Sequence, residues 1–111
     1  MHEITCRGKV VAGKAKLLRH PLPQVLGLMF SRPRNLIFAL NRPKKVRMHM
    51  LFVFFPIDVV FLNLEKEVIE IKENFRPFSV YLAKNKAKYI LELGKGAIDR
   101  AGIRLGDTLS F

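Results

Sequence analysis

The sequence predicts a mainly β protein, either a β-sandwich or a closed barrel-like sheet of about eight short strands with one or two short helices. Short apolar or alternating runs follow one another closely, and Pro, Gly and Asn residues separate them. No stretch offers the long amphipathic helices that parallel crossover connections usually contain. The chain has 111 residues, half of them hydrophobic, so we expect a single domain over residues 1–111 that folds without a disulfide or metal.

The first elements are short. Loose alternation over residues 3–18 predicts two extended pieces, and Gly13 between them suggests the turn of a hairpin. Residues 24–29 follow two prolines and form a candidate for a short helix. The apolar run 36–40 predicts a strand, and residues 41–45 a turn after it.

Residues 48–55 are the most apolar run in the chain, and nearly every side chain in it is hydrophobic. Both faces of such a strand must be covered, so the run predicts a strand at the centre of two packed layers. Pro56 cannot donate a ladder hydrogen bond, so we expect a break there before a second strand over 57–62.

Alternation and turn residues predict the elements of the second half. The expected strands are 68–73, 88–93 and 108–111, and the expected helix is 97–101. Residues 63–66 read as a hairpin turn, residues 75–81 as an irregular connection, and Gly102 as the stop of the helix. These elements complete a succession of strands with little helix.

The charge of the chain is strongly positive and unevenly distributed. The formal net charge is +11, and residues 1–50 hold eleven Lys or Arg residues but one acid, Glu3. Residues 42–47 concentrate four cations in six positions at an expected turn, where they should be exposed. Scarce glutamine and abundant charge also resemble a thermophile composition.

These cations predict contact with an anionic partner, either a nucleic acid or an acidic protein, because Lys and Arg neutralise phosphates and carboxylates. The residues expected to bind it are Arg32, Arg34, Arg42, Lys44, Lys45 and Arg47. No zinc finger, helix-turn-helix or exposed aromatic platform accompanies them in the sequence. Solubility alone is the other explanation of the excess positive charge.

His49 and Asp58 are the two ionisable residues in the apolar stretch 48–63, and they form the alternative candidate site. If they meet, Asp58 would orient the imidazole of His49 for general-base chemistry in a small-molecule or hydrolytic pocket. Otherwise Asp58 accepts backbone N–H groups freed by the break at Pro56, which is a structural role. No Ser or Cys stands in a nucleophile motif, so we expect a binding domain rather than an enzyme.

Other classes of function are disfavoured by composition. One cysteine, Cys6, cannot form an internal disulfide, and the three histidines have no metal-ligand spacing, so we expect no metal or cofactor. No signal peptide is visible, and the apolar stretch is too short and too interrupted to span a bilayer. A cytoplasmic protein that does not enter a membrane is therefore expected.

Three blocks of residues together resemble the family called domain of unknown function 192. They are Gly27-Leu28-Met29-Phe30 with Arg32, then His49-Met50 with Pro56-Ile57-Asp58-Val59-Val60-Phe61, and then Tyr89-Ile90-Leu91-Glu92-Leu93 with Gly96, Gly102-Ile103 and Gly106-Asp107. Their order and spacing span roughly residues 12–111. The resemblance implies a mainly β fold of sandwich type and no activity, since the family is uncharacterised. Many members carry Trp-Met at the position of His49-Met50, which favours a packing role for His49.

Overall fold

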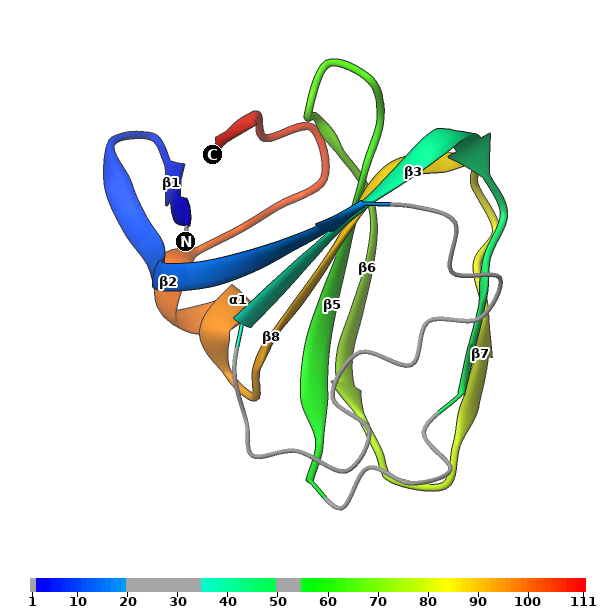
Figure 1. Ribbon diagram of the computed structural model, residues 1–111. Coiled ribbons are helices and arrows are strands. Elements are labelled where there is room, and N and C mark those ends of the chain that lie inside the picture. Colours follow the sequence, from blue (N-terminus) through cyan, green and yellow to red (C-terminus); the bar gives the residue numbers. More distant parts are fainter. Residues whose placement is uncertain (1, 20–34, 50–54) are drawn as a thin grey trace.

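The computed structural model describes residues 2–19, 35–49 and 55–111, with the backbone alone at residues 48 and 49, and it is mainly β (Figure 1). The described strands are β1 (His2–Cys6), β2 (Lys9–Arg19), β3 (Asn35–Lys44), β4 (Arg47–His49), β5 (Ile57–Leu62), β6 (Val68–Phe75), β7 (Val80–Leu82), β8 (Ala87–Gly94) and β9 (Leu109–Ser110). One short helix, α1 (Ala97–Ala101), accompanies them in the described ranges. The predicted helix at 24–29 lies outside the described residues.

The strands form two sheets. The larger sheet has the order β6-β5-β8-β3-β2-β1-β9, and the smaller one pairs β4 with β7. Neighbouring strands are antiparallel except β2 and β3, which run parallel from Ala15 opposite Asn35 to Arg19 opposite Ala39. The long order of the larger sheet brings segments that are far apart in sequence side by side.

Successive side chains of a strand point to opposite faces of the sheet. Buried apolar side chains occupy successive positions in β3, β8 and β5, so both faces of these three strands are apolar. Their register aligns one row of buried side chains on each face. The rows are Phe38, Ile90 and Phe61 on one face and Ile37, Leu91 and Val60 on the other. Central strands buried on both sides are therefore present, and among the described residues they are β3, β8 and β5.

Each apolar face has its own cover. The smaller sheet covers the Phe61 face, where Tyr81 and Ala83 pack against the core. Helix α1 and the terminal strands cover the Val60 face with Ile98, Ile4 and Leu109. Of the run 48–55, residues 48 and 49 belong to β4 in this covering layer, and residues 50–54 lie outside the described part.

The larger sheet curls into a half-barrel, so the expected closed barrel or sandwich is wrong in its detail (Figure 1). Its two edge strands approach one another at one end, where Val68 N donates to Asp107 O at 2.7 Å and Leu109 N donates to Lys66 O at 3.0 Å. A single bridge between Glu67 and Thr108 joins them. Among the described residues, no further pairing joins the two edge strands β6 and β9. The sheet is therefore joined at this end but does not close along its length.

Several local predictions are confirmed and others are wrong. The turn at 63–66, the helix stopped by Gly102 and a strand near the C-terminus are present. The hairpin turn lies at Arg7-Gly8 and not at Gly13, since both residues adopt the positive φ that a tight two-residue turn requires. Strand β3 continues through the expected turn to Lys44, and the supposed irregular segment 75–81 contains the start of β7.

Candidate functional site

Asp58 is buried in β5, and its carboxylate is occupied by three backbone N–H groups. Asn74 N donates to Oδ1 at 3.0 Å, and Gly96 N and Ile98 N donate to Oδ2 at 3.0 and 3.1 Å. The first donor stands at an irregularity of β6, where Asn74 has a φ of 50°, and the other two begin helix α1. The carboxylate thus fastens the end of β6 and the helix to the central strand.

This arrangement separates Asp58 from the strand that carries His49. The Asp58 carboxylate points toward α1, whereas β4 lies in the small sheet on the opposite face. The side chain of His49 lies outside the described part of the structure. All three described hydrogen bonds to Asp58 come from backbone amides. The geometry of Asp58 therefore does not support the hypothesis that Asp58 orients His49 as a general base.

The predicted cations 42–47 lie beside a second cationic segment from the other half of the chain. Lys44 pairs with Ala87, Arg47 pairs with Leu82, and Ala83 N donates to Val46 O at 2.9 Å. This register places the end of β3 and the start of β4 against the connection from β7 to β8. We call the combined surface the basic corner; its cations are Arg42, Lys44, Lys45, Arg47, Lys84, Lys86 and Lys88.

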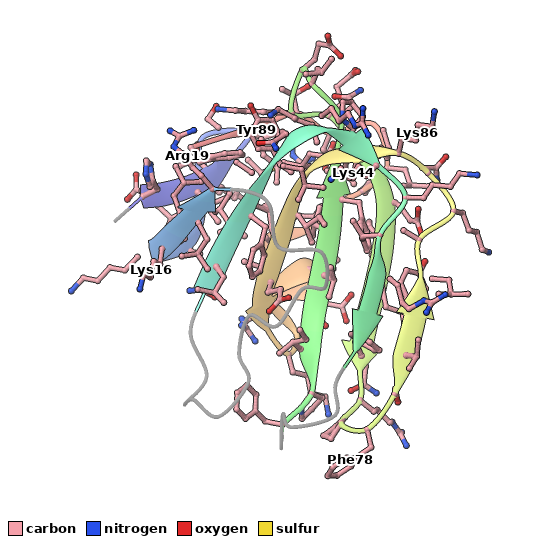
Figure 2. The ribbon with its side chains drawn as sticks, turned by 45° about the vertical axis from the view of Figure 1, so that its right-hand side comes forward. Lys16, Arg19, Lys44, Phe78, Lys86 and Tyr89 are labelled. Carbon is pink, nitrogen blue, oxygen red and sulfur yellow. The ribbon has the colours of Figure 1, made fainter. Side chains whose placement is uncertain are left out.

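The cations of the basic corner have no carboxylate partner among the described residues. The one ion pair in the described ranges joins Arg7 to Asp107 at 2.6 Å, between the hairpin turn and a C-terminal turn. Within the corner, Lys88 donates from Nζ to the carbonyl of Leu40. Figure 2 shows Lys44 and Lys86 at one side of the molecule and Lys16 at the other. Arg32 and Arg34 lie outside the described residues.

Glu70 of β6 lies beneath the basic corner and holds the connection from β7 to β8 in place. Its carboxylate accepts hydrogen bonds from the Tyr81 hydroxyl, from Lys84 N at 3.0 Å and from Asn85 N at 2.9 Å. Burial opposes ionisation, but these donors outweigh it and lower the pKa of Glu70. Burial and the hydrogen bond to Glu70 raise the pKa of Tyr81 to about 12, so Tyr81 stays a neutral donor.

Glu92 is a buried carboxyl group on the apolar Phe61 face, and sequence reasoning did not single it out. It stands in β8 between Leu36 and Val59, in the row next to Phe38, Ile90 and Phe61. No hydrogen-bond or ion-pair partner for it occurs among the described residues. Burial raises the pKa of Glu92 to about 8, because an ionised carboxylate is costly away from water.

Two other features, a metal-ligand cluster and a membrane-spanning helix, are absent from the described residues. Within ranges 2–19, 35–49 and 55–111, no three His, Cys, Asp or Glu side chains gather as metal ligands would. A search of the same ranges finds no helix with the length and apolar character needed to cross a bilayer.

The fold and these residues agree with a family match along almost the whole chain. The profile of DUF192, described as "Uncharacterized ACR", matches residues 3–111. This chain belongs to the DUF192 family. The resemblance expected from the three sequence blocks is thereby confirmed.

Relatives of this DUF192 protein carry the name UPF0127. UPF0127 protein PF1050 of Pyrococcus furiosus is 35% identical over 108 residues, covering 95% of this chain and 92% of the relative. A UPF0127 protein of Thermococcus sibiricus is 33% identical over 95% of this chain and 70% of its own length. A crystal structure of a protein of unknown function from Novosphingobium aromaticivorans has a TM-score of 0.83 at 27% identity, over 98% of this chain and 84% of its own. None of these three names gives a specific function.

We expect Asp58→Asn to destabilise this DUF192 protein, since the amide nitrogen cannot accept the N–H groups of Gly96 and Ile98. Hydrogen bonds to a charged acceptor contribute about 1.5–3 kcal/mol each, so the free energy of unfolding should fall by about 3 kcal/mol. Urea unfolding at neutral pH measures it. The exposed acid Asp99 is the control, and Asp99→Asn should change the value by less than about 0.5 kcal/mol. Equal losses in both variants would contradict the role of Asp58.

Glu92→Gln should raise the stability of the protein at pH 8 and leave it nearly unchanged at pH 4. Between its ordinary pKa of 4.5 and the folded value of about 8, native Glu92 keeps a proton that the unfolded chain has released. The free energy of unfolding therefore falls as pH rises through this window, by about 3–5 kcal/mol from this group.

Urea unfolding of both proteins at pH 4, 6 and 8 tests this dependence. The difference between the two curves isolates Glu92, because Glu70, whose pKa is lowered, contributes equally to both. A difference that stays constant with pH would show that Glu92 is not buried as a neutral acid.

Proposed function

We propose that this protein binds the phosphate backbone of a nucleic acid through the basic corner. The observation that carries the proposal is the meeting of two cationic segments, 42–47 and 84–88, which are about forty residues apart in the sequence. Seven cations without a described carboxylate partner repel one another, and an array of phosphates would relieve that repulsion. Neutralised phosphates release counterions, which supplies the free energy of binding.

Binding through the backbone of the nucleic acid, without selection of bases, fits the corner better than base recognition. Bases are read in single strands by stacking on exposed aromatic side chains. The aromatic residue beside the corner, Tyr89, is only half exposed and packs edge-to-face on Phe111 with 5.3 Å between ring centroids. An acidic protein is the competing partner, and it is distinguished by the experiment below.

Fluorescence anisotropy with a labelled single-stranded oligonucleotide tests the proposal between 50 and 300 mM salt. Four to six contacted phosphates would give a slope of log K against log salt of about −3 to −4. The triple variant Lys45→Gln/Arg47→Gln/Lys86→Gln should reduce the magnitude of that slope by about 2. A slope near zero for the unchanged protein would overturn the proposal.

The matched control removes the same charge from β2, through Lys9→Gln/Lys14→Gln/Lys16→Gln. These three lysines are exposed residues of β2, and Figure 2 shows Lys16 on the opposite side of the molecule from Lys86. The control should keep a slope close to that of the unchanged protein. Equal losses in the two triple variants would assign binding to net charge alone. Saturable binding to polyglutamate without binding to the oligonucleotide would identify an acidic protein as the partner instead.

A further inference from the structure

A second polar feature lies between the two strand edges of β6 and β7. Strand β6 is an edge of the larger sheet, and β7 is paired with β4 alone among the described strands. The two strands are consecutive, yet they do not pair, and a cavity of about 420 Å³ lies between them. Its lining residues are Lys72, Glu73, Asn74, Phe75, Arg76, Ser79, Val80 and Tyr81. We call this cavity the β6–β7 groove.

Glu70 joins the two strands at one end of the groove. Its carboxylate accepts hydrogen bonds from the Tyr81 hydroxyl and from the amides of Lys84 and Asn85, so it ties β6 to β7 and to the residues after it. The turn over residues 76–79 links the strands at the other end, which carries Phe78 in Figure 2. The groove lies between these two connections.

The groove carries two cations, Lys72 and Arg76, one acid, Glu73, and the partly buried ring of Tyr81. Lys72 Nζ lies 5.7 Å from the centroid of the Tyr81 ring. Phe75 packs edge-to-face against the same ring at 6.2 Å but is itself only 1% exposed, so it supports Tyr81 from the core. Neither Lys72 nor Arg76 forms an ion pair with a carboxylate of the described residues. Ser79 adds a hydroxyl group to the lining, and Val80, which is 54% exposed, adds an apolar side chain at the rim of the groove.

We propose that the β6–β7 groove is a binding site for a small aromatic anion, a carboxylate or a phosphate monoester. The anionic group would meet Lys72 and Arg76, and the ring would lie against Tyr81 and cover Val80, with Phe75 buried behind Tyr81. Ligand pockets of roughly 300–1,000 Å³ take molecules of this size, with apolar walls and a few polar groups that fix orientation. The site is separate from the basic corner and does not depend on the function proposed for it.

Asp58 fixes the position of Asn74, one of the residues that line the groove. Its Oδ1 atom holds the amide of Asn74, the residue whose φ of 50° bends the end of β6, and Asn74 lines the groove. The acid that the sequence singled out in the apolar stretch is thus a positioning residue, and it acts through the shape of β6.

Titration of the 15N-labelled full chain with phenyl phosphate, followed by amide chemical shifts, tests the site. We expect saturable shifts of Asn74, Ser79 and Tyr81 with a dissociation constant of about 1 mM or tighter. Inorganic phosphate, which lacks the ring, and benzyl alcohol, which lacks the charge, should each bind at least about tenfold more weakly. Equal binding of either one, or shifts spread over all exposed cations, would overturn the proposal.

Variants separate the groove from general charge effects. Lys72→Gln/Arg76→Gln should weaken phenyl phosphate binding at least about tenfold, since two charge-assisted contacts are lost. The control Lys9→Gln/Arg104→Gln removes the same charge from exposed positions elsewhere and should stay within about twofold. The dispersion of the amide spectrum reports whether each variant is folded. The triple variant of the basic corner should bind phenyl phosphate normally, and weakened binding there would overturn the groove as a separate site.

Discussion

The structure depends on one constraint: the strands β3, β8 and β5 are apolar on both faces, so both faces must be covered. Each cover is fastened to the sheet by one buried carboxylate. Asp58 holds the start of α1 on one side, and Glu70 holds the connection after β7 on the other. The hydrogen bonds that these acids accept offset the cost of burying them, and they place both covers without a long loop or a disulfide.

The same use of acids shapes the surface charge. Three of the eight acids in residues 51–111, Asp58, Glu70 and Glu92, are buried, so they do not offset the surface cations in the way that the formal count suggests. Residues 51–111 have a formal charge close to zero, yet they add Lys84, Lys86 and Lys88 to the basic corner, whose other cations come from residues 42–47. Glu92 is different from the other two, because it has no described partner and its burial raises its pKa to about 8.

The β6–β7 groove lies between two consecutive strands that do not pair with each other. Had these consecutive strands paired, the small sheet would have extended the large one. Glu70 bonds to Tyr81 and to the residues after β7, and Asp58 contacts β6 at Asn74 near the other end. The two buried acids that hold the covers therefore also fix the strands on either side of the groove, whose lining includes Lys72, Arg76, Glu73 and Tyr81.

The sequence by itself determined the mainly β class, the strands near 57–62 and 88–93, the helix ended by Gly102 and the cationic segment 42–47, because hydrophobic periodicity and turn chemistry are local properties. Tertiary structure alone decided which strands are central, which cations share a surface and what Asp58 contacts. The hairpin turn was missed since Gly13 resembled a turn more than Arg7-Gly8 did. The rest depends on the register between strands that are distant in the chain, and register is set by burial of both faces together, which no local pattern contains.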